Sequence, residues 1–320
     1  MVKDKHIISE LNGFFHKNDC NKAINSIMTT IRHLNLRSSC IGIEKRHNCK
    51  LSCLQVLELL LVFPFFMVKN SFQYHHSGLS KLFSCQKDMF YRFMEQDNID
   101  WRKLVYMVSL RLLKRISSRK DSKESLQCLI IDDTDLPKTG FKTEMIGRIY
   151  SHVLHRSILG FKGLFLCHTD GKTQTMLDFS LHGEEGKNPE KKQGLIDKQR
   201  KARFNKKRDG DSAVNTRIKE YRQSKIDRSI EMVREVIRKG IHFDYLLVDS
   251  WFTCADLLNF ICSRHLKCHL IGMIKMDKTR YKTRFGNLNA SDIIERLKKE
   301  KSVKYSRKLN CHYAYIDAEY

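Results

Sequence analysis

Asp133 and Asp249 each end an apolar run, and they are the residues of this sequence best placed to do chemistry. Short apolar runs that end in acid are typical of buried strands, which deliver polar groups at their carboxyl ends. Carboxylates from two strands of one sheet can share a metal site, and Mg²⁺, or Mn²⁺ in its place, binds through such oxygens. Two ions about 4 Å apart can activate an attacking oxygen and stabilise the leaving oxygen of a phosphodiester. A single aspartate here would fit a turn or a helix cap equally well, so the pair is what favours a metal site.

Three acids crowd the first position: Asp132, Asp133 and Asp135. Successive strand residues face opposite sides of a sheet, so Asp132 and Asp133 cannot both enter one site without a twist. We expect Asp133, which Thr134 follows, to be the ligand. Asp132 is then expected to face solvent or to support the site from outside, and Asp135 to belong to a turn before Pro137.

The elements that must position these acids follow in the order strand, hairpin, helix, strand. The hairpin is indicated by Asp170-Gly171, because both residues tolerate the positive φ angles of a tight turn. The predicted elements are strands at 126–133, 163–168, 173–181 and 243–249, and a helix at 226–239 that Gly240 closes. This order predicts an α/β fold in which the two acids meet at one edge of a sheet.

The apolar face predicted for the helix at 226–239 is formed by Ile226, Ile230, Val233 and Ile237. Glu231 and Glu235 lie on the same helix and are interpreted as charges on its solvated face.

Charge identifies the class of partner. The 320 residues carry 59 Lys and Arg against 36 Asp and Glu, a net charge of +23. Such an excess favours a polyanionic partner, because basic side chains release counterions from a phosphate backbone when they bind it. Composition alone also fits a ribosomal-type protein or a membrane-surface binder. The 11 scattered cysteines are typical of free thiols in a reducing compartment, and no apolar signal-peptide core opens the chain, so a cytoplasmic protein is expected.

Residues 1–120 have helical periodicity and hold 20 basic against 9 acidic residues, which makes them a candidate DNA-binding region. The alternative is a solvated helical surface. The apolar stretch 54–68 is shorter than a membrane span and contains Glu58 and Pro64, so a buried helix is expected there. Residues 117–123 are polar throughout and are interpreted as a linker.

A second basic segment lies at 186–228, with 15 basic against 6 acidic residues between 187 and 228. We expect it to contact DNA phosphates, which position a duplex without reading its sequence, although a flexible solvated loop would have the same composition. The residues expected to make these contacts are Lys191, Lys192, Arg200, Lys201, Arg203, Lys206, Lys207 and Arg208.

Three segments together resemble the cut-and-paste insertion-sequence transposases of the DDE type. They are LIIDDTDLPKTG, YSHVLHRSILGFKGLFLCHTDGKTQTMLDFSLH and YLLVDSWF, and the resemblance runs from about residue 45 to the end. It implies an RNase H-like catalytic core with a mixed sheet, preceded by a helical region and interrupted by a β-rich insertion. It also implies that Asp133 and Asp249 match the first two catalytic acids, with Mg²⁺ as cofactor.

One part of that family's pattern is missing. Its third acid, a Glu, belongs to a helical motif of Tyr, Arg, Glu and Lys, and no segment of this sequence has the required spacing. The chain ends 71 residues after Asp249, within what the resemblance makes the start of the β-rich insertion. The expectation is a C-terminally truncated transposase.

The expected domains are a helical DNA-binding region at 1–120, a catalytic core at 124–264 with its basic insertion at 186–228, and a partial β-rich insertion at 265–320. The expected function is metal-dependent nicking and strand transfer at the ends of an insertion sequence. Its partners would be the terminal inverted repeats and the target DNA, bound near the nucleoid by a homodimer, with no membrane involved. The alternative is a catalytically incomplete remnant that only binds DNA.

Overall fold

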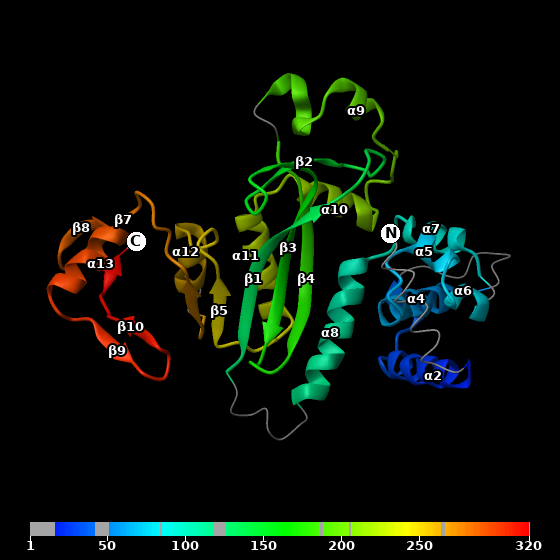
Figure 1. The fold of residues 1–320 in the computed structure, drawn as a ribbon, viewed down its shortest axis with the longest axis horizontal. Helices are drawn as coiled ribbons and strands as arrows, with labels where there is room; N and C mark the ends of the chain where they lie inside the picture. Colours follow the sequence, from blue (N-terminus) through cyan, green and yellow to red (C-terminus); the bar gives the residue numbers. More distant parts are fainter. Residues whose placement is uncertain are drawn as a thin grey trace. The chain divides into compact units, whose positions relative to one another are not determined.

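The computed structural model describes residues 17–41, 51–83, 85–117, 126–185, 188–204, 206–263 and 266–319 (Figure 1). The chain divides into two compact units. The first, here called the helical unit, takes residues 1–122, 140–146 and 196–221. The second, the core unit, takes residues 123–139, 147–195 and 222–320. Most of the linker predicted at 117–123 lies outside the described residues, and Ser117 is the last residue of a helix.

The described residues of the helical unit between 17 and 117 form helices and no strand, as the sequence predicts. A cluster of aromatic rings lies at their centre: Phe63 stacks on Tyr74 at 5.4 Å and meets Phe90 edge-on at 5.0 Å. The elements are α2 (Lys17–His33), α3 (Ser38–Ile41), α4 (Cys53–Val62), η1 (Phe63–Phe66), α5 (Ser71–His75), α6 (Leu79–Leu82), α7 (Lys87–Met94) and α8 (Trp101–Ser117).

The apolar stretch 54–68 forms helix α4 and the 3-10 turn η1, both within the helical core. Ser52 caps α4: its hydroxyl accepts from the amide of Gln55, whose side chain accepts in return from the amide of Ser52. Glu58 is buried within the helix at 9% exposure. The prediction of a buried helix is confirmed, and none of the described helices is long and apolar enough to cross a membrane.

The core unit is built on a mixed sheet in which β4, β3, β1, β5 and β6 lie side by side in that order (Figure 1). The strands are β1 (Cys128–Pro137), β2 (Gly147–Ser151), β3 (Arg156–Thr169), β4 (Gln174–His182), β5 (Tyr245–Val248) and β6 (His269–Gly272). Strand β3 pairs antiparallel with β1, β2 and β4, whereas β1, β5 and β6 are mutually parallel. Strand β2 pairs with the first part of β3 and was not predicted.

The hairpin predicted around Asp170-Gly171 joins β3 to β4. Gly171 has φ +82°, and the carboxylate of Asp170 accepts from the amide of Thr173 at 2.7 Å. The register of the hairpin shifts next to Leu166, where a β-bulge sits on β4. Because of this bulge, Leu177 and Asp178 are both buried although they are neighbours in the strand.

Helix α11 (Lys225–Arg238) packs against β3 and β4, and helix α12 (Ala255–Ser263) packs against α11. The predicted helix and its closing Gly240, at φ +66°, are confirmed. The predicted apolar face is displaced by part of a turn: Met232, Val233 and Val236 are fully buried, whereas Ile237 is 37% exposed. The buried face includes Ser229 and Arg228, so periodicity of apolar residues alone could not locate it.

Residues 280–319 of the core unit contain helix α13 (Ala290–Lys299) and two small sheets. Tyr281, Ile293 and Leu297 are the centre of its separate small core. The strands are β7 (Arg280–Thr283), β8 (Gly286–Asn289) and β11 (Ala318–Glu319) in one sheet, and β9 (Lys304–Ser306) and β10 (Cys311–Tyr313) in the other.

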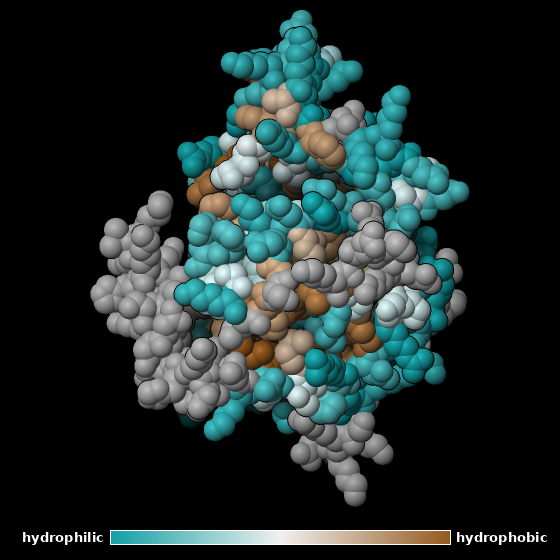
Figure 2. Space-filling view, turned by 90° about the vertical axis from the view of Figure 1, so that its right-hand side faces the viewer, coloured by the Kyte–Doolittle hydropathy of each residue, from teal (hydrophilic) through white to brown (hydrophobic). Residues whose placement is uncertain are grey.

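On the face shown in Figure 2, hydrophilic residues predominate and hydrophobic ones gather toward the middle. Large apolar side chains do reach the surface of the helical unit: Phe65, Met67 and Phe72 are each more than half exposed.

Candidate functional site

Asp132 and Asp249 follow directly after the last registered pair of the parallel strands β1 and β5. Strands β1 and β5 are in parallel register up to the pair Ile131 and Val248. The residue that follows each member of this pair is an aspartate. Ile131 and Val248 are both buried. Because side chains alternate along a strand, Asp132 points to the other face of β1 from Ile131. Asp249 follows the last residue of β5, and its charge acts on the carboxyl group of Asp132. We call these two residues the carboxylate pair.

The electrostatics of Asp132 agree with this placement. Partial burial of its carboxyl group raises its pKa, and the negative charges of Asp249 and Asp133 raise it further. A hydrogen bond from the amide of Asp133, at 2.8 Å, opposes the shift without cancelling it. Two neighbouring carboxylates that repel each other in this way form a place where a cation is stabilised.

Asp133 does not join the carboxylate pair. It points to the face of the sheet that α11 covers, where its carboxylate accepts a hydrogen bond and forms an ion pair with Lys225, the first residue of α11. The sequence-based expectation pairs Asp133 with Asp249. In the structure the charge of Asp249 acts on Asp132, and Asp133 has Lys225 as its partner. The residues before Asp132 are apolar at successive positions, so the sequence does not show which phase of β1 is buried.

Asp135 also differs from its expected place, because it lies within β1 and not in a turn. Its carboxylate forms an ion pair with the buried Lys162 at 2.5 Å. Burial alone would raise the pKa of Asp135, but hydrogen bonds from Lys162 and Ser151 and the charge of Lys162 outweigh burial and lower it. Asp135 is therefore a structural partner within the sheet.

The loop after β5 holds the carboxylate of Asp249 in a fixed orientation. One of its oxygens accepts from the amides of Trp251 at 2.9 Å and Phe252 at 3.1 Å. The hydroxyl of Thr253 donates to the carbonyl of Asp249 at 2.9 Å, and the fully buried Phe252 anchors the turn. Gly272 of β6 leaves room for Thr253, whose oxygen would lie 2.3 Å from a Cβ at that position.

Lys225 reaches the same edge of the sheet from the start of α11. Its ammonium lies 4.0 Å from the ring centroid of Trp251 and 6.0 Å from that of Phe252. A cation over an indole face is stabilised by the ring quadrupole. Lys225 therefore contacts two of the elements that carry the acids: Asp133 on β1 and the loop that follows Asp249. The sequence did not identify Lys225 as a site residue, because no motif or spacing around it indicates a site.

A polar row on β4 fixes the beginning of α11. The row consists of Asp178, Ser180 and His182, which are between 0% and 2% exposed. The carboxylate of Asp178 forms an ion pair with Arg228 of α11 at 3.0 Å. The β-bulge turns the row inward, where an unbroken alternation from Thr175 would have turned it outward.

His182 connects the polar row to the residues just before α11. Its Nδ1 lies 3.1 Å from the carbonyl of Gln223, and its Nε2 lies 2.6 Å from the hydroxyl of Ser180. Since a carbonyl only accepts, Nδ1 of a neutral ring is the donor, and Nε2 accepts from Ser180. Gln223 in turn donates to Glu231 at 2.7 Å. Lys225 therefore lies two residues after Gln223, whose carbonyl group is held by His182.

The carboxylate pair suits a hard divalent cation, whose remaining positions water and substrate oxygens would fill. Within the described ranges, no group of three or more His, Cys, Asp or Glu side chains is placed to hold a metal ion. The donor set that the described residues offer is therefore the two carboxylates, and Asp132 and Asp249 are the residues that would hold Mg²⁺.

The basic residues expected to contact DNA have different surroundings. Lys191 and Lys192 are exposed in η3 (Pro189–Gly194) of the core unit. Lys201 and Lys207 are exposed in the helical unit, which holds α9 (Asp197–Lys201) and α10 (Ala213–Tyr221). Arg200 forms an ion pair with Asp197.

The other three residues of that set are used inside the helical unit. Arg208, whose side chain is 10% exposed, forms ion pairs with Asp97 at 2.8 Å and with Glu144. Lys206 pairs with Asp97 at 3.1 Å, and burial lowers the pKa of the half-buried Arg203. These contacts tie residues 196–221 to the helices, so part of the basic segment has a structural role.

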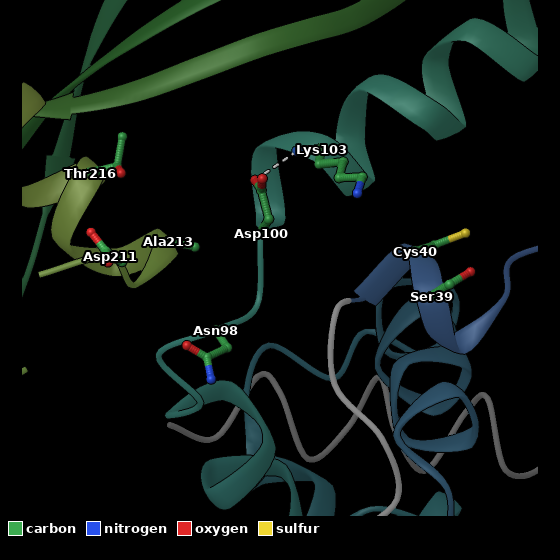
Figure 3. Close-up of a pocket in the computed structure, with 8 residues that line it drawn as sticks. All are labelled: Ser39, Cys40, Asn98, Asp100, Lys103, Asp211, Ala213 and Thr216. Atoms are coloured by element: carbon green, nitrogen blue, oxygen red, sulfur yellow. Dashed lines mark hydrogen bonds between the residues drawn. The ribbon is translucent and has the colours of Figure 1, made fainter. Parts of the chain in front are cut away.

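A cavity of about 390 Å³ lies in the helical unit between α3, the start of α8 and the segment at 211–216 (Figure 3). Asp100, Asp211 and Lys103 are among its lining residues, and the carboxylate of Asp100 accepts from the amide of Lys103 at 2.9 Å. It contains none of the acids or basic residues predicted for a site.

The sheet has the antiparallel pairs β1–β3 and β3–β4 on one side and the parallel strands β5 and β6 on the other. Together with the acids that follow the parallel pairing of β1 with β5, this order defines an RNase H-like nuclease core. Comparison of the sequence with protein families agrees: the profile of the DDE superfamily endonucleases matches residues 79–284, more than half of the chain. The chain belongs to the DDE superfamily endonucleases. Asp132, Asp133 and Asp249 all lie within the matched span.

Comparison with individual proteins adds little. No curated protein has a significant match to the chain. Among solved structures, the chain is similar to the piggyBac transposase in a synaptic complex with hairpin DNA, at 15% identity and a TM-score of 0.33. The match covers 79% of this chain and 48% of that one, so the chain spans about half the length of that transposase.

Proposed function

We propose that the protein is a DNA transposase that nicks DNA at the ends of a mobile element and transfers the cut strands. The observation that carries this proposal is the carboxylate pair, Asp132 and Asp249, at the point where the parallel pairing of β1 with β5 ends. Endonucleases of this superfamily use divalent metal ions. In our proposal the pair holds Mg²⁺, for which Mn²⁺ can substitute.

A bound Mg²⁺ would supply charge stabilisation to the phosphodiester and activate the attacking oxygen. The chain's own residues orient that site. The amides of Trp251 and Phe252 fix the carboxylate of Asp249, and the register of β1 against β5 fixes Asp132 beside it. Asp133, the ligand expected from the sequence, supports the site through its ion pair with Lys225.

The test is Mg²⁺-dependent nicking of a duplex that carries the terminal sequence flanking the coding region. Asp132→Asn and Asp249→Asn are expected to lower the nicking rate at least about 100-fold, because each removes a metal ligand. Asp133→Asn, one residue away, is expected to lower the rate by much less, because it removes the partner of Lys225 and not a metal ligand. Loss of nicking in Asp133→Asn with normal rates in Asp132→Asn would restore the original assignment of the first ligand.

A second function has support from one observation. The described residues offer two carboxylates at this edge and no third ligand, and two carboxylates hold a pair of metal ions weakly. The alternative is therefore a protein that binds the same DNA without cutting it. It predicts tight binding to the terminal duplex with no Mg²⁺-dependent nicking by the wild type, which the same assay measures.

The partner in either case is double-stranded DNA, and we propose that the exposed lysines Lys191, Lys192, Lys201 and Lys207 contact its phosphates. A DNA complex that joins two element ends would hold two copies of the chain. Its place of action would be the cytoplasmic nucleoid.

A further inference from the structure

Lys225 is the one cationic side chain in contact with both acid-bearing elements among the described residues. Its side chain is 18% exposed, and its carboxylate partner Asp133 is 22% exposed. Trp251, whose ring lies beneath the ammonium, is 41% exposed. Lys225 is thus partly shielded from water but open at the edge of the sheet where the carboxylate pair lies.

The ion pair with Asp133 does not use the full capacity of the ammonium. A lysine ammonium has three N–H donors, and the described contacts give it one carboxylate oxygen and the faces of two aromatic rings. Asp132, Asp133 and Asp249 together bring three negative charges to this edge. Any phosphodiester that approaches the carboxylate pair would be repelled without a nearby cation of the protein.

Hydrogen bonds on both sides of Lys225 fix the position of its backbone. The hydroxyl of Ser229 donates to the carbonyl of Lys225 at 2.7 Å, and the side chain of Ser224 accepts from the amide of Ile226. Behind these, His182 holds the carbonyl of Gln223. A lysine on a fixed backbone loses less rotamer freedom when it binds an anion than one on a mobile loop, which favours a site over a solvated charge.

We propose that Lys225 binds a backbone phosphate of the DNA beside the carboxylate pair. Trp251 is a positioning residue that holds its ammonium there, and Asp133 is the counterion of the ammonium until DNA binds. The inference rests on the proposed function for the identity of the substrate. It assigns to Asp133 a role through Lys225 and not through a metal. No covalent step is involved: the ammonium donates hydrogen bonds to a phosphate oxygen and keeps its protons.

The experiment measures DNA binding, so that it does not depend on nicking. A set of duplexes of about 30 base pairs carries the terminal sequence, each with one phosphate replaced by a neutral methylphosphonate. The dissociation constant of each is measured for the wild-type chain, Lys225→Met and Asp133→Asn. Lys225→Met is expected to weaken binding of the unmodified duplex about fivefold to tenfold and to lower its salt slope by about 0.9, the value for one phosphate neutralised by the protein.

At one position, the methylphosphonate is expected to weaken binding by the wild type and to leave binding by Lys225→Met unchanged. Asp133→Asn frees the ammonium and is expected to bind at least as tightly as the wild type. Lys225→Arg keeps the charge, shows whether the fold tolerates a change there, and is expected to recover most of the affinity.

Two outcomes would overturn the proposal. In one, every methylphosphonate has the same effect on the wild type and on Lys225→Met. In the other, Asp133→Asn loses as much affinity as Lys225→Met, which would make the ion pair a packing contact only. If one phosphate depends on Lys225 but the wild type never nicks DNA, Lys225 is a phosphate ligand and the transposase function is refuted. If the wild type nicks DNA but no phosphate depends on Lys225, the transposase function is supported and the role of Lys225 is refuted.

Discussion

At the scale of single residues, the neighbouring acids Asp132 and Asp133 have opposite environments. Asp132 faces Asp249 and its pKa is raised, whereas Asp133 has a lysine as its partner. The sequence indicated that only one of the two could enter the site. It did not indicate which one, because the residues before Asp132 are apolar at successive positions, and only the structure shows that Leu129 and Ile131 form the buried face of β1.

His168 gives a prediction at the same scale. It is 6% exposed, and burial lowers its pKa, while a backbone hydrogen bond with His242 and the charge of Asp170 oppose the shift only in part. As the pH falls through about 6.5, the unfolded chain binds a proton at this residue, whereas the folded chain binds it only at a lower pH. Stability contributed by the neutral ring is therefore present above about pH 6.5 and is lost as the pH falls toward the lower pKa of the folded state, by up to about 1.4 kcal/mol per pH unit.

Urea unfolding at pH 7.5 and 5.5 measures this effect. The free energy of unfolding of the wild type is expected to fall over this range by more than that of His168→Gln, which has no titrating ring. Equal losses in the two proteins would show that His168 does not contribute to the acid sensitivity of the core unit.

At the scale of elements, the polar row of β4 is the feature that joins the sheet to α11. Asp178→Ala is expected to destabilise the core unit by about 3 kcal/mol, because the buried guanidinium of Arg228 loses its buried carboxylate partner. Glu231→Ala is the matched control, since Glu231 also pairs with Arg228, at 2.8 Å, but its side chain is 45% exposed. The control is expected to cost less than about 1 kcal/mol.

Chemical unfolding measures both variants. If the two substitutions cost the same, burial of the Asp178 pair is not what holds α11 on the sheet. The Asp178→Ala variant is also expected to lose the contribution of Lys225 to DNA affinity, because the start of α11 is no longer fixed. A control variant with normal affinity separates this effect from general damage.

Elements were more predictable from the sequence than the contacts between them. Strands β1, β3, β4 and β5, helix α11 and the turn at Gly171 follow from local patterns of apolar residues and glycine. The β-bulge at Leu177 left no local signal, yet it decides that Asp178, Ser180 and His182 face inward. For the same reason the buried face of α11 includes Arg228, which its apolar periodicity excluded.

At the scale of the whole molecule, the net charge of +23 predicted a nucleic-acid partner but not which basic residues meet it. The basic segment contains both kinds of residue. Lys201 and Lys207 are exposed, and among the described residues neither has an ion pair. Arg208 is nearly buried between Asp97 and Glu144, where it joins three separate stretches of the helical unit.

The two kinds are separated by measuring DNA affinity across salt concentrations together with stability. The double variant Lys201→Ala/Lys207→Ala is expected to lower the slope of log affinity against log salt by about 1.8, which is about 0.9 for each phosphate that the protein no longer neutralises, with an unchanged free energy of unfolding. Arg208→Ala is expected to destabilise the helical unit by about 3 kcal/mol, since it leaves two partly buried carboxylates without their guanidinium. An unchanged slope in the double variant would show that the two exposed lysines do not contact DNA phosphates. A stable Arg208→Ala protein with a reduced slope would show that DNA competes for this arginine with Asp97 and Glu144, because only a guanidinium that leaves its ion pairs can reach a phosphate.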